Sequence, residues 1–436
     1  MDATHSLSEW LAYIERQHPQ SIAMGLERVR AVAACLGLAA GATKRTGRRR
    51  IRSGIADSTI VVAGTNGKGS TVAFIEAIAR AAGWKVGTYT SPHLLRYNER
   101  VRIDGVQVDD AALVAAFTEV EAARGEIALT YFEYGTLAAL WLFDRAGLDL
   151  AVLEVGLGGR LDAVNVVDAD VAVITTVDLD HIDWLGANRE AIGAEKAGIA
   201  RGWKPLILGE IDPPSSVLQR AYQLGANAIR FGSDFFAEPV DATRWRWRDV
   251  SLRLELPMPA LRAPVQLVNA ATAIAALRAL ARPMPRAAWA GGVVRAGIPG
   301  RLQVFWRDQV EVLVDVGHNP QAAGALAVAL QRQSVSGRTH AVYAALSDKD
   351  VTGVVAALAG QIDTWRIAGL DGARGQSVQA LAARLRATPA AAAARFDQVA
   401  DALADALGQA LPGERVLVFG SFHTVAEVLP LLNSEG

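Results

Sequence analysis

The glycine-rich segment at residues 64–71 constrains the fold of this chain more than any other feature. It reads Gly-Thr-Asn-Gly-Lys-Gly-Ser-Thr and stands between an apolar segment and an amphipathic one. Glycines between a strand and a helix let backbone N–H groups curl around phosphates, while the helix N-terminus and the lysine supply positive charge. The ordinary P-loop pattern is not matched, because Val62 occupies its first glycine position and Gly69, not a hydroxyl residue, follows Lys68. We therefore predict a nucleotide-phosphate loop of a different kind.

Apolar strands and helices alternate through the first half of the chain. The predicted strands are 60–63, 85–89, 150–155, 169–177 and 205–208, and the predicted helices lie within 6–38 and at 71–82, 111–124 and 134–146. Several of these strands are apolar throughout, as expected for a parallel sheet that helices cover on both faces. The pattern predicts a doubly wound α/β domain.

A second α/β series follows a Gly- and Pro-rich stretch at residues 283–300. An alanine-rich helix at 269–281 precedes that stretch, a low-complexity patch at 390–394 reads as a loop or a helix end, and the later strands are predicted at 310–316, 340–345, 362–367 and 415–419. Such stretches commonly mark domain boundaries. We predict an α/β protein of two domains: one at 1–296 with a parallel sheet and the phosphate loop, and a smaller α/β domain at 297–436.

Residues 244–256 show a different pattern, in which side chains alternate with a period of two. Arginines alternate with Trp245 and Trp247, and leucines then alternate with polar residues. This periodicity predicts a half-exposed strand or hairpin. An Arg/Trp ladder could instead stack nucleic-acid bases, but the overall charge favours the amphipathic strand.

The composition favours a soluble cytoplasmic protein over a nucleic-acid or membrane protein. Hydrophobic residues make up 51% of the chain, the net charge is −1, and Cys35 is the only cysteine. One cysteine cannot form an internal disulfide and suits a reducing cytosol. We expect no signal peptide, no bilayer-spanning segment and a monomer. The Arg-rich stretch at 41–54 is interpreted as a solvated loop, with phosphate or nucleic-acid binding as the alternative.

Polar residues at predicted strand ends are candidate metal ligands. Glu154 interrupts an apolar strand, and a buried carboxylate is costly unless it is paired or bound to metal. Mg²⁺ prefers oxygen ligands of this kind. His181 follows another strand beside Asp180, although a lone histidine is more often structural. Lys196, taken by itself, would be an ordinary helix-surface lysine.

The segment 64–70 resembles the nucleotide loop of the Mur ligase superfamily, and Gly69 after the lysine is similar to its folylpolyglutamate synthase branch. The resemblance implies that Ser91, in Tyr-Thr-Ser-Pro-His-Leu, binds magnesium together with Glu154 and His181. It also implies that Lys196, in Glu-Lys-Ala-Gly-Ile, is carboxylated by CO₂ and holds a second magnesium ion. Lys68, Glu154, His181 and Lys196 are then the catalytic residues.

Further site residues are implied by the same resemblance. ATP would be bound by Gly64, Thr65, Asn66, Gly67, Lys68, Gly69, Ser70, Asn269, Arg301 and Asp315, and the incoming glutamate by His318 and Ser421. We expect ATP and two Mg²⁺ ions as cofactors. By the same resemblance, domain 1–296 would be a P-loop, Mur-ligase-like ATPase domain that binds ATP and a pterin. Domain 297–436 would be a smaller Rossmann-like α/β domain that carries glutamate ligation.

Two segments resemble the dihydropteroate-binding parts of bifunctional dihydrofolate synthase/folylpolyglutamate synthases. They are 129–135, which contains Thr130, Tyr131, Phe132 and Glu133, and 159–163, which contains Leu161, Asp162 and Ala163. A third, with Ser21, Ile22, Ala23 and Met24, resembles the pterin-side loop, but Ala23 stands where that pattern often has Asp. The loss of this acceptor leaves two functions open, namely the bifunctional enzyme and a synthase that only extends glutamate tails.

The predicted reaction joins L-glutamate to 7,8-dihydropteroate or to a reduced folate through an acyl phosphate. Lys68 and magnesium would offset charge on the transferring phosphoryl group, and a water-excluding site would protect the intermediate. No residue is identified as a base for the attacking amine. Two further alternatives are a cell-wall ligase, against which Gly69 and residues 129–135 argue, and a nucleotide-binding regulator, against which Glu154, His181 and Lys196 argue.

Overall fold

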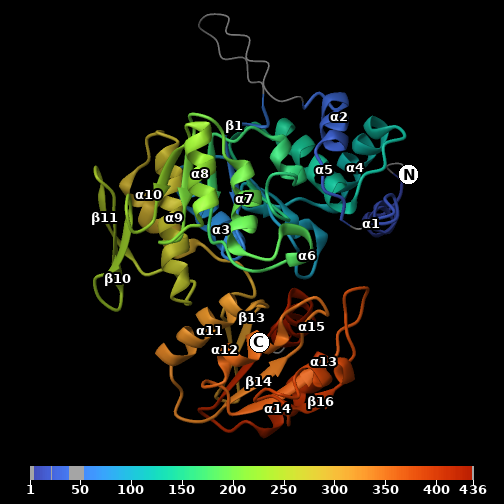
Figure 1. The fold of residues 1–436 in the computed structure, drawn as a ribbon, viewed down its shortest axis with the longest axis vertical. Coiled ribbons are helices and arrows are strands. Elements are labelled where there is room, and N and C mark those ends of the chain that lie inside the picture. Colours follow the sequence, from blue (N-terminus) through green and yellow to red (C-terminus); the bar gives the residue numbers. More distant parts are fainter. Residues whose placement is uncertain (1–3, 21, 39–53, 435–436) are drawn as a thin grey trace, which may run out of the picture. The chain divides into compact units, whose positions relative to one another are not determined.

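The computed structural model describes residues 4–20, 22–38 and 54–434 (Figure 1). Ser21 and almost all of the Arg-rich stretch therefore lie outside the described residues. The chain forms two compact units, the first comprising 1–260 with 267–297 and the second 261–266 with 298–436. The predicted division of binding functions between domains 1–296 and 297–436 stays a prediction.

The first unit is built on an eight-stranded sheet. Its strand order is β4-β3-β2-β5-β1-β6-β7-β8. The six strands from β2 to β8 in this order are parallel, whereas β3 and β4 are antiparallel additions at one edge. The strands are β1 (Ala56–Ala63), β2 (Val86–Tyr89), β3 (Val101–Ile103), β4 (Val106–Gln107), β5 (Leu148–Glu154), β6 (Val171–Ile174), β7 (Pro205–Leu208) and β8 (Asn227–Arg230).

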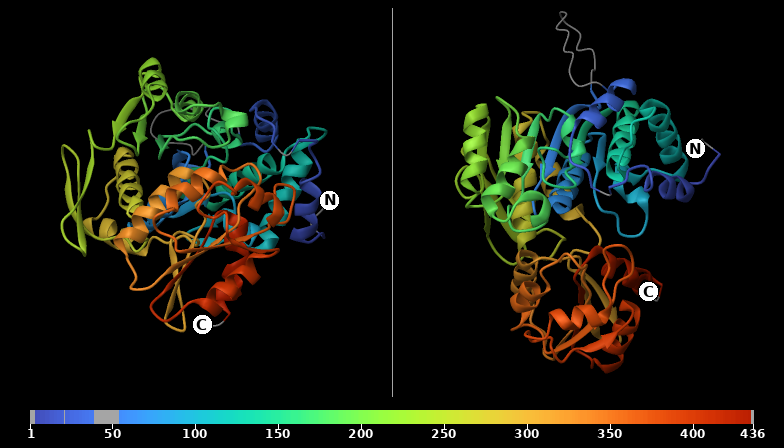
Figure 2. Two further views of the ribbon diagram at one scale, coloured as in Figure 1. Left: turned by 60° about the horizontal axis from the view of Figure 1, so that its bottom comes forward. Right: turned by 45° about the vertical axis from the view of Figure 1, so that its right-hand side comes forward.

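Helices pack on this sheet and on one another. Helices α1, α2, α4 and α5 pack together, and α3 packs against α10 (Figure 2). The α3–α10 contact is close enough that a Cβ on Gly292 would lie 2.3 Å from the Ile78 Cα. The helices are α1 (Leu7–Ile14), α2 (Glu27–Cys35), α3 (Lys68–Ala81), α4 (Asp110–Arg124), α5 (Tyr131–Ala146), α6 (Ile182–Leu185), α7 (Arg189–Lys196), α8 (Ser215–Leu224), α9 (Val265–Ala279) and α10 (Arg286–Arg295).

Helix α5 begins three residues earlier than the predicted segment 134–146. Its start is fixed by a capping box: the Thr130 hydroxyl accepts from the Glu133 N–H at 3.2 Å, and the Glu133 carboxylate accepts from the Thr130 N–H at 2.8 Å. These reciprocal bonds satisfy backbone donors that a helix start otherwise leaves without partners. The residues 131–133 therefore belong to the first turn of α5.

A three-stranded antiparallel sheet explains the period-two segment. It comprises β9 (Phe236–Pro239), β10 (Arg244–Arg248) and β11 (Arg253–Pro257), in the order β11-β10-β9. Trp245 and Trp247 are fully buried, and their indole N–H groups donate to the carbonyls of Pro257 and Ala271. Because both indoles pack in the interior, they do not form a surface on which bases could stack. The hairpin prediction is confirmed.

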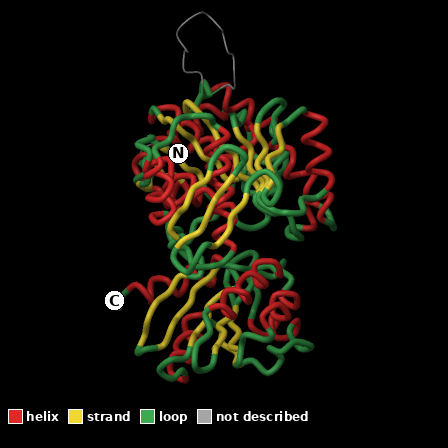
Figure 3. Tube along the Cα trace, turned by 90° about the vertical axis from the view of Figure 1, so that its left-hand side faces the viewer, coloured by secondary structure: helices red, strands yellow, loops and turns green. Residues whose placement is uncertain are grey.

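The second unit contains a six-stranded sheet of order β12-β13-β17-β14-β15-β16, in which only β12 is antiparallel. Figure 3 shows strands in yellow and helices in red in both units. Segment 390–394 was predicted as a loop or helix end, but Ala394 begins β16. The strands are β12 (Gln303–Arg307), β13 (Val310–Asp315), β14 (Thr339–Tyr343), β15 (Thr364–Ala368), β16 (Ala394–Phe396) and β17 (Arg415–Phe419). The helices are α11 (Pro320–Arg332), α12 (Val351–Leu358), α13 (Val378–Arg384), α14 (Val399–Gln409) and α15 (Phe422–Asn433).

Membrane-spanning helices are not found in the part of the chain that the structure describes, since no helix there is both long and apolar enough to cross a bilayer.

Candidate active site

Most predicted site residues of the first unit gather at one edge of its sheet. Strands β2, β5, β1, β6 and β7 are parallel neighbours, so their carboxyl ends meet at the same edge. Ligands of open α/β sheets bind at that edge. Ser91 follows β2, Glu154 ends β5, residues 64–67 follow β1, and His181 lies beyond the end of β6.

The nucleotide loop connects β1 to α3 in a conformation that requires its glycines. Gly67 has a φ of 85° and caps α3, so a non-glycine residue would be strained there. A Cβ on Gly64 would lie 1.9 Å from the Thr175 Oγ1, so no larger residue fits. The Lys68 ammonium donates to the carbonyls of Gly64, at 3.0 Å, and Thr65, at 3.3 Å. The lysine thus folds back over its own loop.

The loop is also held by residues that follow β6. The Thr65 hydroxyl donates to the Asp178 carbonyl and accepts from the Asp178 N–H, each at 3.0 Å. The Asn66 carbonyl accepts from the Thr175 hydroxyl at 2.5 Å. These bonds satisfy polar groups of the loop and fix its conformation.

Asn269 lies against the same loop. A Cβ on Gly67 would be 2.6 Å from the Asn269 Oδ1, so the amide occupies the space beside the glycine. The sequence predicted that Asn269 starts a helix, which is wrong, because α9 begins at Val265 and Asn269 lies in its second turn. The helical position still brings its side chain to the loop.

Two predicted magnesium ligands are direct neighbours. The Ser91 N–H donates to the Glu154 Oε2 at 3.3 Å, and only 4% of Glu154 is exposed. Within the described residues, no three His, Cys, Asp or Glu side chains form a ready-made metal cluster. A serine hydroxyl and one carboxylate nevertheless suit Mg²⁺, which keeps several water or phosphate oxygens as ligands.

His181 occupies a strained backbone position. Its φ is 52°, in the left-handed region, and it caps the short helix α6. Its N–H donates to the Asp180 carboxylate at 2.9 Å, and its Nε2 lies 3.9 Å from the same carboxylate. Strained non-glycine residues cluster at functional sites because the surrounding structure holds them in place.

Lys196 is not a surface lysine. It ends α7, and only 3% of it is exposed. Burial, reinforced by the nearby positive charge of Lys68, lowers the pKa of Lys196 to about 7, although Asp180, Asp162 and Glu210 oppose this effect. Lys196 therefore lies within electrostatic range of the nucleotide loop, a position that its sequence context did not reveal.

The three predicted pterin segments lie side by side. The Gly25 N–H donates to the Leu161 carbonyl at 3.3 Å, and a Cβ on Gly158 would lie 3.6 Å from the terminal methyl of Met24. The Phe132 ring packs so closely on Gly156 that a Cβ there would be 2.6 Å from it. Ile22, Ala23 and Met24 are half-buried, whereas Ala163 is buried.

Arg28 connects these segments, and the sequence did not single it out. Its guanidinium donates to the Glu133 carboxylate at 2.8 Å and to the Ala23 carbonyl at 2.9 Å. Glu133 also caps α5, so its carboxylate orders protein segments and is already engaged. The residue pattern carried no signal for this pair, because its members stand 105 positions apart.

Asp162 is enclosed by the loop that follows β5. Its carboxylate accepts from the N–H groups of Leu157, at 2.9 Å, and Val164, at 3.0 Å. Burial raises its pKa to about 6, against the lowering effect of these bonds and of Lys68. The carboxylate thus orders residues 156–164 and lies within electrostatic range of the nucleotide loop.

Glu210 is a further candidate that was missed. It follows β7 at the same sheet edge, and Arg189 donates to its Oε2 at 3.2 Å. Its Oε1 is buried without a partner in the described residues, and burial raises its pKa to about 7. The available signal was a charged residue two positions after the apolar strand 205–208.

The predicted residues of the second unit also meet at strand ends. The Asp315 carboxylate accepts from the N–H groups of Leu302, at 2.8 Å, and Gly317, at 2.7 Å. Burial raises its pKa, although Arg301 opposes this. The guanidinium of Arg301 lies 5.2 Å from the centre of the Phe422 ring.

His318 and Ser421 flank that phenylalanine from neighbouring strands. The His318 ring lies 6.3 Å from the Phe422 ring, and its Nδ1 is 2.9 Å from the Val316 carbonyl. The Ser421 hydroxyl caps α15 by accepting from the Thr424 N–H at 2.9 Å. The structure thus brings Arg301, His318 and Ser421 together around Phe422.

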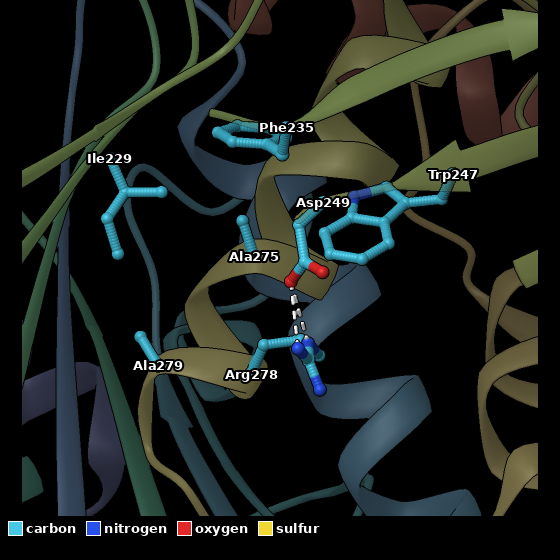
Figure 4. Close-up of a pocket in the computed structure, with 7 residues that line it drawn as sticks. All are labelled: Ile229, Phe235, Trp247, Asp249, Ala275, Arg278 and Ala279. Carbon is cyan, nitrogen blue, oxygen red and sulfur yellow. Dashed lines mark hydrogen bonds and ion pairs between the residues drawn. The ribbon is translucent and has the colours of Figure 1, made fainter. Parts of the chain in front are cut away.

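The first unit also contains a small cavity of about 140 Å³ that holds none of these residues (Figure 4). An ion pair between Asp249 and Arg278, at 2.8 Å, crosses it. Its lining comprises Ile229, Phe235, Trp247, Asp249, Ala275, Arg278 and Ala279. We assign it no part in the site.

The chain is similar to known ligases over nearly its whole length. The family description "Mur ligase middle domain" matches residues 62–276, and "Mur ligase, glutamate ligase domain" matches residues 300–422. The dihydrofolate synthase/folylpolyglutamate synthase of Escherichia coli K12 is 45% identical, over 99% of this chain and 97% of its own length.

Solved structures agree with the sequence comparison. That of E. coli FolC in complex with DHPP and ADP has a TM-score of 0.91 and 45% identity, and covers 100% of this chain and 99% of its own. A bifunctional folylpolyglutamate synthase/dihydrofolate synthase with Mn, AMPPNP and L-glutamate bound has a TM-score of 0.89 and 44% identity, and covers 99% of each chain. The predicted fold class is confirmed, and the chain belongs to the Mur ligase family and, within it, to the dihydrofolate synthase/folylpolyglutamate synthases.

Proposed function

We propose that this protein is an ATP-dependent ligase that joins L-glutamate to 7,8-dihydropteroate, forming dihydrofolate, and adds further glutamates to reduced folates. The observation that carries the proposal is one sheet edge that holds both the nucleotide loop and the Ser91–Glu154 pair. The relatives support it, since their structures contain ADP and DHPP in one case and Mn, AMPPNP and L-glutamate in another.

ATP binds with its phosphates on residues 64–70. The backbone N–H groups of this loop and the start of α3 face the phosphates, and Lys68 adds a full positive charge. Ser91, Glu154 and His181 hold Mg²⁺, which supplies further positive charge against the transferring phosphoryl group. Asn269 lies beside the loop at Gly67. Arg301 and Asp315 are the further residues that we expect to contact ATP.

Lys196 carries a carboxyl group and holds a second Mg²⁺. Only a neutral amine reacts with CO₂, and burial lowers the pKa of Lys196 to about 7, so the neutral form is well populated in neutral solution. In the reaction the amine nitrogen forms a bond to carbon and releases a proton. The product is an anion beside Lys68, so a repulsive pair becomes an attractive one.

Ligation then proceeds in two steps. The acceptor carboxylate attacks the γ-phosphorus and ADP leaves, which gives an acyl phosphate. The amine of glutamate, held by His318 and Ser421, attacks the acyl carbon, phosphate leaves with the bonding electrons, and the amine proton passes to solvent. Because the reactants are bound beside one another, each step takes place between groups that are already close together.

The acceptor is held by Ile22, Ala23, Met24, Thr130–Phe132 and Leu161–Ala163, together with Ser21, which lies outside the described residues, and Glu133, which orders the site. The alternative is a synthase that only extends tails, because Ala23 offers no acceptor for the pterin ring. Since Arg28 holds the Ala23 carbonyl, the segment is positioned through its backbone. This favours the bifunctional enzyme.

We propose a cytoplasmic monomer, whose exposed Cys35 would remain a thiol.

The test is a mass-spectrometric assay of the purified protein with ATP, Mg²⁺, L-glutamate and either 7,8-dihydropteroate or a reduced folate. Product from both acceptors is expected. Product from the folate alone would leave only tail extension, and no product from either would favour a nucleotide-binding regulator. Lys68→Ala and Glu154→Ala should each remove activity; full activity in both would refute the proposed mechanism.

A further inference from the structure

Arg100 is a buried cation that has no carboxylate partner. It ends the short 3-10 helix Tyr97–Arg100, and only 8% of it is exposed. Within the described residues it forms no ion pair, and its one side-chain hydrogen bond runs from Nε to the Nδ1 of His93 at 2.9 Å. Burial of a charge without an ionic partner is costly, and a bound carboxylate would offset that cost.

The surroundings of Arg100 place it at the acceptor side of the site. Its carbonyl accepts from the Thr90 N–H at 2.9 Å, directly before Ser91. Its guanidinium carbon lies 5.1 Å from the centre of the Tyr97 ring and 5.5 Å from that of the Tyr131 ring. Arg100 therefore bridges the Ser-Pro-His loop and the segment 130–133.

The two terminal nitrogens of Arg100 remain available. Neither nitrogen makes a hydrogen bond within the described part of the chain, and neither is completely buried. They therefore reach solvent-accessible space. The tyrosine rings offset part of the charge, but a guanidinium fork is best matched by a carboxylate that binds both nitrogens.

The acceptors of the proposed reaction differ by one carboxylate. Dihydropteroate has a single carboxylate, which reacts, whereas a folate ends in a glutamate whose γ-carboxylate reacts and whose α-carboxylate does not. The reacting group must lie with Lys68 and the Ser91–Glu154 pair. Arg100 contacts a different set, namely His93, Tyr97 and Tyr131.

We propose that Arg100 binds the unreactive α-carboxylate of the terminal glutamate of a folate, and so serves tail extension far more than the first ligation. This inference rests on the proposed function. His93 orients the Arg100 side chain, because its Nδ1 accepts a hydrogen bond from the Arg100 Nε. The proton of the neutral His93 ring must then lie on Nε2.

The experiment measures kcat/KM for three acceptors: dihydropteroate, a reduced folate, and the same folate with 4-aminobutyrate in place of its terminal glutamate. The analogue keeps the reacting carboxylate and lacks only the α-carboxylate. Each acceptor is used with the wild-type protein, Arg100→Met, Arg100→Lys and the control Arg96→Met. Arg96 lies in the same segment but is exposed and pairs with Asp110.

In Arg100→Met, the ratio of kcat/KM for the folate to that for dihydropteroate should fall by about ten- to a hundredfold, the usual range for a hydrogen-bonded charge. In the wild-type protein, kcat/KM for the analogue should be lower than that for the folate by a similar factor. For the analogue itself, Arg100→Met should lower kcat/KM little further. Arg100→Lys should recover part of the ratio, and Arg96→Met should leave it unchanged.

Equal losses for both acceptors in Arg100→Met would overturn the proposal and make Arg100 a support of the loop. A wild-type protein that uses the analogue as well as the folate would also overturn it, even if the variant failed to fold. Failure of the proposed function is distinguishable, because the wild-type protein would then give no product from any acceptor.

Discussion

Replacement of Lys196 by methionine should stabilise the protein while removing its activity. The folded chain lowers the pKa of this lysine from 10.5 to about 7. One pKa unit corresponds to ~1.4 kcal/mol, so burial of the amine costs the folded state about 4–5 kcal/mol below pH 7 and about 3 kcal/mol at pH 8. Methionine fills similar space without a charge, so the free energy of unfolding at pH 8 should rise by about 3 kcal/mol.

The pH dependence has a definite sign. Between pH 7 and 10.5 the unfolded chain binds more protons at this residue than the folded chain does, so the wild-type free energy of unfolding should rise with pH. Lys196→Met should lose this slope. Urea unfolding in metal-free and CO₂-free buffers measures both effects, and Lys204→Met, which removes a half-exposed surface lysine, is the matched control.

Equal free energies of unfolding and equal slopes in the wild type and Lys196→Met would refute the reasoning, because Lys196 would then titrate normally. Added bicarbonate gives a second check. It should stabilise the wild-type protein with magnesium present and leave Lys196→Met unchanged.

Three further changes test other parts of the structure. Gly64→Ala should weaken ATP binding by at least about tenfold, measured by titration calorimetry, because its Cβ would lie 1.9 Å from the Thr175 Oγ1. Glu133→Gln should lower the free energy of unfolding by about 1–3 kcal/mol and raise KM for dihydropteroate, because Arg28 loses its ionic partner; an unchanged KM would contradict its ordering role. Trp247→Ala should cost about 3–5 kcal/mol in urea unfolding, since the indole is buried.

Strands buried on both faces could be predicted closely from the sequence. β7 and β17 were predicted with their observed ends, and β5 and β13 within two residues, because continuous apolar runs reveal such strands directly. The strands that were missed, such as β9 and β16, are short and partly polar. Their pairing depends on neighbours that the local pattern does not identify.

The glycine turn between β1 and α3 was predictable because its residues are consecutive. The burial of Lys196 and the position of Arg100 were not, because each depends on residues from distant segments. The start of α5 was predictable in principle, since Thr130 and Glu133 have capping-box spacing. The roles of the other site residues remain predictions that the experiments above address.

The contact between Asn269 and Gly67 has a consequence for the order of events during synthesis. The nucleotide loop leaves the ribosome about 200 residues before the helix that carries Asn269. At common synthesis rates this delay is roughly 10–40 s. During that interval the nascent chain carries its phosphate-binding turn without the adjoining amide. A chain released early would therefore lack the amide that lies beside Gly67 in the finished protein.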